Sequence, residues 1–388
     1  MPTPLTARKI LEKLVSFPTV STASNLALVD WVEEYLDGFG IHCHRDYDAT
    51  RQKASLFAHV GPEVEGGIVL SGHTDVVPVK GQEWHSDPWQ VVERDGRLYG
   101  RGTCDMKGFD AIVLAAVPMA LERGLRRPMQ IALSRDEEIG CVGAPPMIEA
   151  MAASGLPRAS AAIIGEPSNM KAVTAHKGGT GFNTHIHGHE VHSSIMHTGV
   201  SATMEAGRLI QWANEQNALN AARTPGPLDA QFDPPWTTLH VGMVAGGTAN
   251  NITAKDCGFV ITFRNVPSES LEDWRQAYLA KVREVEAGMQ AVAPQTRIET
   301  EAFFDVPGLR PEDGGEAEAL VRRLTGDNGV HVVSYGTEAG QFQDRGYSAV
   351  ICGPGDIAQA HQPNEYITMD QFEAGQRFMA DLVDTLCR

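Results

Sequence analysis

Acidic residues and histidines directly follow four short apolar runs of the sequence. They are His73 and Asp75 in "IVLSGHTD", Asp136, Glu137 and Glu138 in "IALSRDEE", Glu166 in "AAIIGEP", and His361 in "AVICGPGDIAQAH". Imidazoles and carboxylates bind divalent metal ions, and they are also the side chains that most often transfer protons in catalysis. Each cluster alone is typical of a solvated turn, but four such clusters after four runs predict one site with metal or acid–base chemistry.

The apolar runs before these clusters have the composition of short buried strands. They cover residues 68–70, 131–133, 161–164 and 349–352. Long helical patterns follow the first run, "MKGFDAIVLAAVPMALERG", and the last, "MDQFEAGQRFMADLVDTLC", and such alternation is typical of α/β domains. Because open α/β sheets bind ligands at the carboxyl ends of their strands, we expect the clusters to line one cleft. Asp105 of "GRGTCDMKG", just before the first of these helices, would join them.

The pattern changes in the middle of the chain. It predicts, in order, a strand (180–187), a helix (200–218), two strands (238–245 and 257–264), a helix (268–288) and a strand (296–303). This is the order of a ferredoxin-like α+β domain. We therefore expect an α/β catalytic domain with a mixed, mostly parallel sheet flanked by helices, formed by residues 1–177 and 302–388. The ferredoxin-like domain would be an insertion at 178–301.

The composition limits the expected partners and compartment. The chain has 388 residues, of which 42% are hydrophobic, and a formal net charge of −17. This acidity argues against nucleic acid and anionic membrane surfaces, which attract clustered Lys and Arg. No apolar run approaches the ~20 residues of a membrane span, and "MPTPLTARKI" lacks the apolar core of a signal peptide. We therefore expect a cytoplasmic protein. Its six cysteines are scattered without CxxC spacing, which indicates reduced thiols rather than a disulfide framework.

The number of carboxylates at the expected cleft favours bound metal ions. Neighbouring carboxylates cannot all stay ionised without a counter-charge, because mutual repulsion raises their pKa. Two divalent cations would remove this difficulty, and one carboxylate can bridge two ions about 3.5–4 Å apart. Mixed nitrogen and oxygen donors suit zinc, cobalt or manganese better than calcium, which prefers oxygen ligands alone. The sequence therefore predicts a binuclear metal centre.

Five motifs carry a resemblance to a known family. They are "SGHTDVVP", "GRGTCDMKG", "DEEIGCVGA", "GEPS" and "AHQPNEYI", and they occur in the family's order over nearly the whole chain. The sequence resembles the dinuclear zinc deacetylases and peptidases, which include acetylornithine deacetylase, succinyl-diaminopimelate desuccinylase, aminoacylase and the glutamate carboxypeptidases. The resemblance implies two Zn²⁺ ions per chain, with Co²⁺ able to substitute.

The resemblance also implies a role for each residue at the strand ends. The implied ligands are His73 and Glu166 for one metal ion, Glu138 and His361 for the other, and Asp105 as a bridge between them. Glu137 would be the general acid–base. Asp75 would accept a hydrogen bond from the far ring nitrogen of His73, which fixes the tautomer of that ligand. A cis peptide bond is expected after Asp105.

In the family, the ferredoxin-like domain forms a homodimer and sends a histidine into the partner's active site. The matching residue is His192 of "GHEVHSSIMHTGVSA", although a surface histidine in a His-rich loop is the alternative. That loop would also contain His185, His187, His189 and His197. The motifs "GGTANNITAKDC" and "FRNVP" suggest that Asn251 and Arg264 bind substrate, since an arginine fork suits a free carboxylate.

The implied reaction is hydrolysis of the amide bond of an N-acyl amino acid, a small-molecule substrate. A metal-bridging water would attack the carbonyl while Glu137 carries its proton to the leaving amine. The stretch "YGTEAGQF" favours N2-acetyl-L-ornithine as the substrate. Glu338 in this stretch would bind the side-chain ammonium of ornithine, or it would only anchor the site. The alternatives are acetylcitrulline, succinyl-diaminopimelate, a broader range of acylamino acids, and dipeptides. A non-catalytic, metal-binding dimeric module is the alternative from another class.

Overall fold

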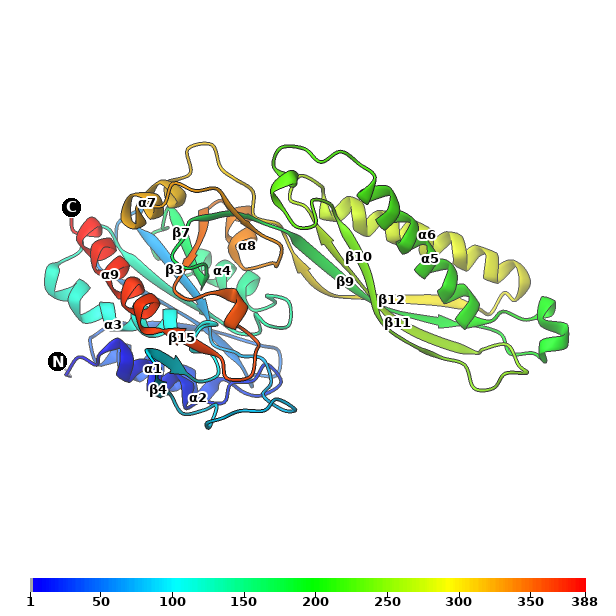
Figure 1. The fold of residues 1–388 in the computed structure, drawn as a ribbon, viewed down its shortest axis with the longest axis horizontal. Helices are drawn as coiled ribbons and strands as arrows, with labels where there is room; N and C mark the ends of the chain where they lie inside the picture. The colour runs from blue at the N-terminus through cyan, green and yellow to red at the C-terminus, as the bar shows by residue number, and fades with distance from the viewer. Residues whose placement is uncertain (1–2) are drawn as a thin grey trace. The chain divides into compact units, whose positions relative to one another are not determined.

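The computed structural model describes residues 3–388, which form two compact units (Figure 1). The first unit comprises the chain up to Ala175, together with Pro311–His331 and Thr337–Arg388. The second comprises His176–Arg310 and Val332–Gly336. The first unit is therefore built from the early and late parts of the chain, and the second from its middle.

A mixed β-sheet forms the centre of the first unit, with the strand order β1-β2-β6-β3-β7-β14-β8. Its strands are β1 (Cys43–Tyr47), β2 (Ala54–Val60), β3 (Ile68–His73), β6 (Met129–Ser134), β7 (Ala161–Pro167), β8 (Val173–His176) and β14 (Ser348–Gly353). The short strand β13 (His331–Val333) lies where the chain passes between the units. The four central strands, β6, β3, β7 and β14, are parallel. Their carboxyl ends therefore meet at one edge of the sheet.

Helices flank this sheet. They are α1 (Ala7–Val15), α2 (Leu26–Asp37), α3 (Lys107–Arg123), α4 (Ala144–Ala153), α7 (Glu316–Thr325), α8 (Ala339–Asp344) and α9 (Met369–Leu386), with a 3₁₀ turn at η3 (Ile357–Gln359). Residues of α1, α2, α3, α7 and α9 share one hydrophobic core with the central strands. A small antiparallel sheet contains β4 (Val92–Arg94), β5 (Arg97–Tyr99) and β15 (Tyr366–Thr368).

The second unit has the order strand, helix, strand, strand, helix, strand. These elements are β9 (Gly178–His187), α5 (Ala202–Ala221), β10 (Thr238–Gly246), β11 (Asp256–Asn265), α6 (Leu271–Val292) and β12 (Arg297–Val306), with 3₁₀ turns at η1 (Ser193–Thr198) and η2 (Asp229–Gln231). The strands form an antiparallel sheet in the order β10-β11-β9-β12. Helices α5 and α6 lie side by side and share a second hydrophobic core with the sheet (Figure 1).

The expected fold class is confirmed by both the mixed sheet and the ferredoxin-like order. Every expected element of the middle segment is present, with bounds that differ by a few residues. His185 and His187 lie on β9, however, so they are not in the His-rich loop that the sequence suggested. The short helices α4, α7 and α8 were not predicted.

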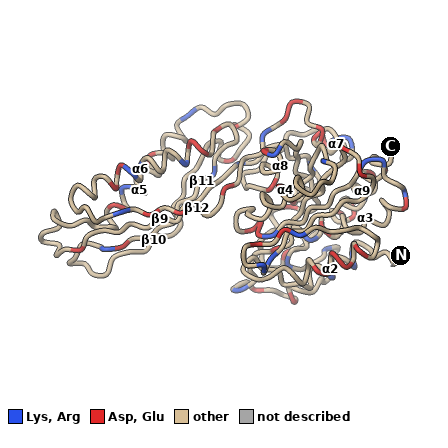
Figure 2. Tube along the Cα trace, turned by 180° about the vertical axis from the view of Figure 1, so that it is seen from behind, with Lys and Arg blue, Asp and Glu red and all other residues tan. Residues whose placement is uncertain are grey.

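Basic and acidic residues are interspersed along the described part of the chain (Figure 2). Within residues 3–388, none of the helices has the combination of length and apolar character that a membrane span requires.

Candidate metal centre

The four clusters found in the sequence converge at the carboxyl edge of the parallel strands. His73 is the last residue of β3, and Glu166 lies near the end of β7. Glu137 and Glu138 follow β6, and His361 follows β14 in a loop after η3. The side chains of His73 and Glu166 are buried, whereas that of His361 is about half exposed. The loops after these strands therefore place all the residues around one centre.

Asp105 lies between the two histidines. Its Oδ1 is 3.0 Å from His73 Nε2, and its Oδ2 is 3.2 Å from His361 Nε2. Burial opposes ionisation of this carboxyl, but hydrogen bonds from His361 and His73 outweigh it and hold the pKa of Asp105 below its usual range. Because each oxygen faces a different imidazole, this carboxylate has the position of a bridge between two ions.

The remaining donors complete two groups around His73 and His361. Glu166 Oε1 is 3.8 Å from His73 Nε2, and Glu138 Oε2 is 2.9 Å from His361 Nε2. Donor atoms of His73, Asp105 and Glu138 all lie within 4.8 Å of one another, and so do those of His73, Glu137 and Glu166. Ligands of one zinc ion are about 3.3 Å apart, since metal–ligand bonds measure about 2.0–2.1 Å. The residues therefore fit a pair of divalent ions that share Asp105.

The site favours bound positive charge. Burial raises the pKa of Glu137 to about 8 and raises the pKa of Glu166 well above its usual range. Hydrogen bonds to Asp105 and Glu138 raise the pKa of His361 to about 10. Neighbouring carboxylates at this site can stay ionised beside a bound cation, and without one some of them take up protons. Metal binding would therefore release these protons.

The contacts of Asp75 differ from the sequence-based expectation. His73 Nδ1 lies 2.9 Å from the main-chain oxygen of Asp75 and 3.7 Å from its carboxylate. The carboxylate instead accepts hydrogen bonds from the backbone N–H groups of Glu137, at 3.0 Å, and Glu138, at 3.3 Å. Ser21 Oγ donates a third bond at 2.7 Å. The carboxylate is turned toward the loop after β6 because that loop presents two N–H donors, and so it positions the acidic pair.

Glu365 positions Asp105, and the sequence interpretation missed it. Its side chain is fully buried, pairs with Arg101 Nη1 at 2.6 Å, and accepts hydrogen bonds from the backbone N–H groups of Cys104 and Asp105. This carboxylate therefore shapes the loop that carries Asp105. The only signal in the sequence was the place of Glu365 four residues after His361 in "AHQPNEYI".

The backbone around the centre adopts uncommon conformations. The peptide bond between Asp105 and Met106 is cis, as expected. Asp136, Cys141 and His361 have φ values of 57°, 54° and 62°, in the left-handed region that few non-glycine residues adopt. Left-handed conformations of non-glycine residues concentrate at functional sites, where the surrounding structure enforces them.

Glu338 is buried beneath the centre, at the start of α8. Its Oε2 accepts a hydrogen bond from Ser71 of β3 at 3.0 Å, and its Oε1 accepts one from Ser134 of β6. Both oxygens are therefore held by serines of neighbouring strands. This arrangement favours the anchoring role over direct contact with substrate.

The other predicted residues belong to the second unit, and their roles in catalysis stay predictions. His192 is exposed at the start of η1, and Asn251 lies beside it, since the Asn251 main-chain oxygen accepts a hydrogen bond from Ser193 N at 2.8 Å. Arg264 is exposed on β11, with its guanidinium 5.8 Å from the centre of the Phe304 ring.

Comparison with known proteins assigns the chain to a family. Residues 69–385, which carry every strand-end cluster, match the description "Peptidase family M20/M25/M40". The chain belongs to this family. Among proteins similar to this M20/M25/M40 member are the acetylornithine deacetylases of Myxococcus xanthus and Pasteurella multocida. The Myxococcus protein is 35% identical, and the match covers 98% of this chain and 97% of that protein. The Pasteurella protein is 32% identical, and the match covers 96% of both chains.

Solved structures support the same family fold. An M20 family metallo-carboxypeptidase from Sulfolobus solfataricus has a TM-score of 0.77 at 16% identity over 100% of both chains. A tripeptidase from Staphylococcus aureus has a TM-score of 0.73 at 18% identity over 98% of both chains. The M20/M25/M40 assignment and the clustered ligands together identify the chain as a metal-dependent hydrolase.

Proposed function

We propose that the chain hydrolyses the amide bond of an N-acyl amino acid, with N2-acetyl-L-ornithine as the favoured substrate. The observation that carries this proposal is the full-length similarity, at 35% and 32% identity, to proteins named acetylornithine deacetylase. The paired ligand groups at the strand ends supply the chemistry that such a reaction needs. The negative net charge of the chain, −17, favours a substrate with an ammonium group.

Two zinc ions are the proposed cofactors. His73 and Glu166 would hold one, Glu138 and His361 the other, with Asp105 shared, because these donors lie at the spacings described above. When bound, the ions would polarise the amide carbonyl and acidify water.

Glu137 is the proposed general acid–base. Its carboxyl belongs to the same donor group as His73 and Glu166, and its Oε1 accepts a hydrogen bond from Cys141 Sγ at 3.0 Å. From that position it would take a proton from the attacking water and deliver it to the leaving amine. Asp75 holds the backbone of Glu137 at 3.0 Å, which fixes the base relative to the ligands.

His192 is the proposed donor to the oxyanion, acting in the site of a second copy of the chain. Ser194 N donates a hydrogen bond to His192 Nδ1 at 3.2 Å, and this contact favours the tautomer that has its proton on Nε2. Nε2 then carries the proton on an exposed side chain, as a donor to an oxyanion requires. Asn251, beside it, and Arg264 are the proposed contacts of the substrate carboxylate.

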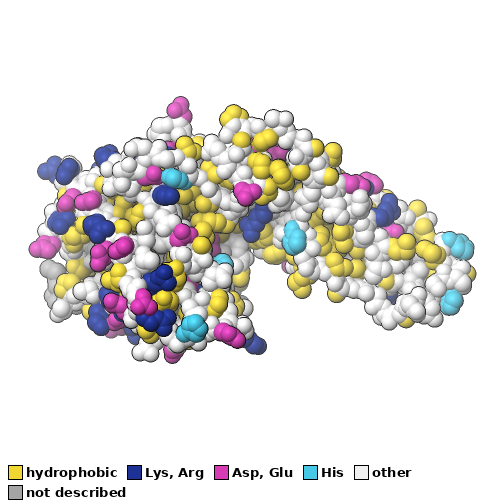
Figure 3. Space-filling view, viewed as in Figure 1, with side chains coloured by type: hydrophobic (Ala, Val, Ile, Leu, Met, Phe, Trp, Pro, Cys, Tyr) yellow, Lys and Arg dark blue, Asp and Glu magenta, His cyan; other side chains and the backbone are white. Residues whose placement is uncertain are grey.

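A homodimer is supported by the surface of the second unit. Strand β10 is an edge strand, and its side chains Met243 and Val244 are 70% and 55% exposed. Apolar side chains are visible on the surface of this unit in Figure 3. An exposed apolar edge strand is a template for pairing with another chain.

Amine release from a substrate panel tests the proposed reaction. The panel contains N2-acetyl-ornithine, N-acetyl-citrulline, succinyl-diaminopimelate and a dipeptide, each with zinc or cobalt added and with a chelator-treated control. We expect the highest kcat/KM for N2-acetyl-ornithine and no turnover after chelation. A preference for the dipeptide would replace deacetylation with peptidase activity, and no turnover of any amide would contradict the proposed reaction class.

A further inference from the structure

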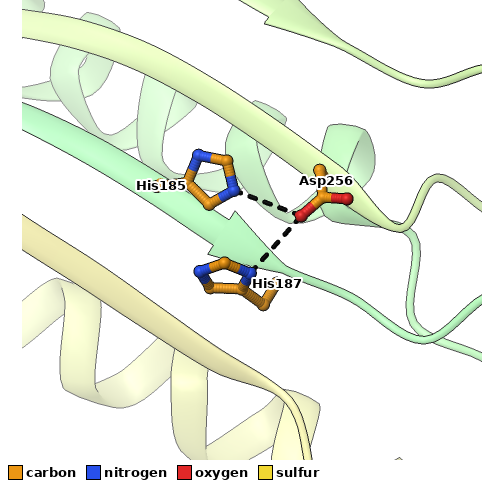
Figure 4. A group of neighbouring side chains, drawn as sticks. All are labelled: His185, His187 and Asp256. Carbon is orange, nitrogen blue, oxygen red and sulfur yellow. Dashed lines mark hydrogen bonds and ion pairs between the residues drawn. The ribbon is translucent and has the colours of Figure 1, made fainter.

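Another group of potential metal ligands lies on the second unit and shares no residue with the candidate metal centre. It consists of His185, His187 and Asp256, and Figure 4 shows the two imidazoles turned toward one carboxylate. The side chains of His185 and Asp256 are about half exposed, and that of His187 is a quarter exposed. We call these three residues the β9–β11 cluster.

The strand geometry explains why the three side chains meet. Side chains two residues apart on a strand point to the same face, so His185 and His187 share the face of β9 that turns away from the hydrophobic core. Asp256 begins β11 and pairs directly with His187 across the antiparallel ladder. The residue opposite His185 is Gly258, and a Cβ placed there would lie 3.6 Å from His185 Nδ1. Because Gly258 has no side chain, the ring of His185 can lie over β11 and reach Asp256.

The distances match those around a single metal ion. Asp256 Oδ1 is 3.2 Å from His185 Nε2 and 3.3 Å from His187 Nδ1. The edge of a tetrahedron with metal–ligand bonds of about 2.0–2.1 Å is about 3.3 Å. The two oxygen–nitrogen distances therefore match this edge, and all three donor atoms lie within 4.8 Å of one another. Three ligands would leave a fourth position for water or an external donor.

A second carboxylate lies beside one of the imidazoles. Glu299 of β12 lies on the other side of β9, with its Oε2 3.3 Å from His187 Nε2. Arg297 Nε holds Oε1 of the same carboxylate at 2.8 Å. A histidine that binds metal through one nitrogen usually donates the other N–H to a carboxylate, which fixes the tautomer and raises the basicity of the ligand. Glu299 lies within ion-pair distance of His187 Nε2, although the two make no hydrogen bond in this structure.

We propose that the β9–β11 cluster is a third metal site, which binds Zn²⁺ or a similar divalent ion through His185 Nε2, His187 Nδ1 and Asp256 Oδ1. Glu299 supports the site through His187. Two imidazoles and one carboxylate suit zinc, cobalt, nickel or copper, and they disfavour calcium and magnesium. The bound ion would link two neighbouring strands of the second unit.

Zinc content at controlled free zinc tests this site. Wild type, His187→Ala and Asp256→Asn are dialysed against a series of zinc buffers, and bound zinc is measured by elemental analysis. We expect wild type to bind one more zinc ion per chain than either variant. Glu299→Gln should still bind that ion, but about 10–100-fold more weakly. Turnover and circular dichroism of the variants should match wild type.

His240→Ala is the matched control, because His240 is an exposed histidine on β10 of the same sheet, outside the cluster. It should bind as much zinc as wild type. Equal zinc content in wild type and His187→Ala would overturn the proposal and leave the cluster as imidazoles paired with carboxylates. An equal loss in His240→Ala would show nonspecific surface binding, which also overturns it. The result depends only on the difference between variants, so it is independent of the proposed amide hydrolysis.

Discussion

Replacement of Asp75 by Asn tests how the acidic pair is positioned. Asp75 is 3% exposed, and its two carboxylate oxygens accept hydrogen bonds from the backbone N–H groups of Glu137 and Glu138 and from Ser21 Oγ. The N–H of Glu137 faces Oδ1 and that of Glu138 faces Oδ2. An asparagine has one acceptor oxygen, so in either orientation its NH₂ group faces one of these N–H donors.

The loss of stability in Asp75→Asn follows from this missing acceptor oxygen. A buried donor left without a partner costs about 1–3 kcal/mol, and the remaining bonds lose the charge that made them stronger. We expect the free energy of unfolding of Asp75→Asn to fall by about 3 kcal/mol. Loss of a group that orients a metal ligand typically lowers metal affinity or activity by about 10–100-fold. Because Glu138 is a proposed ligand of the second ion, we expect a loss of that size in kcat.

Zinc content, kcat and urea unfolding are the measurements, made on wild type, Asp75→Asn and Ser21→Ala. His73 bonds to the main-chain oxygen of Asp75, which the substitution retains, so the ion at His73 should stay. Zinc in Asp75→Asn should therefore fall by about one ion per chain relative to wild type at limiting free zinc. Ser21→Ala removes only one of the three hydrogen bonds and should cost about 1 kcal/mol with normal zinc content.

Asp75→Asn with as much bound zinc as wild type and a kcat within about twofold of wild type would refute this reasoning, since the proposed effect is at least tenfold. Equal losses in Ser21→Ala would also contradict it, because that variant keeps both bonds to the acidic pair.

Three further predictions concern other residues. Glu137→Gln should keep both metal ions of the centre while its kcat falls by orders of magnitude. Glu138→Gln should lose one ion, as measured by elemental analysis. Equal metal loss in both variants would contradict the assignment. His192→Ala should lower kcat about 10²–10³-fold, and subunit exchange with Glu137→Gln should restore about a quarter of wild-type activity, with no recovery if His192 serves its own chain. Burial lowers the pKa of His176 to about 4, so the unfolded chain binds more protons between pH 6.5 and 4. The free energy of unfolding should fall by about 3 kcal/mol as the pH is lowered across that range. The urea midpoint should fall less steeply with decreasing pH in His176→Asn than in wild type. Equal dependence of the midpoint on pH in both proteins would exclude His176 as the cause.

The local pattern of the sequence was enough to predict the fold class and to group the candidate ligands, whereas the role of each ligand came from the resemblance to a known family. Apolar runs alternate with helical periodicity, and parallel strands place their carboxyl ends at one edge of a sheet. That rule brought His73, Glu138, Glu166 and His361 together in advance, although they are far apart in the chain. Asp105 followed from its motif before a long helix.

Contacts between distant segments were decided only by the tertiary structure. The sequence paired Asp75 with His73, its neighbour, because local spacing cannot show that two N–H groups of the loop after β6 face the same carboxylate. The burial of Glu365 depends on a buried arginine more than 250 positions earlier in the chain. The β9–β11 cluster depends on strand register, since a shift of one residue would turn Asp256 away from His187. Register is set by the packing of the whole sheet, and no short stretch of sequence contains it.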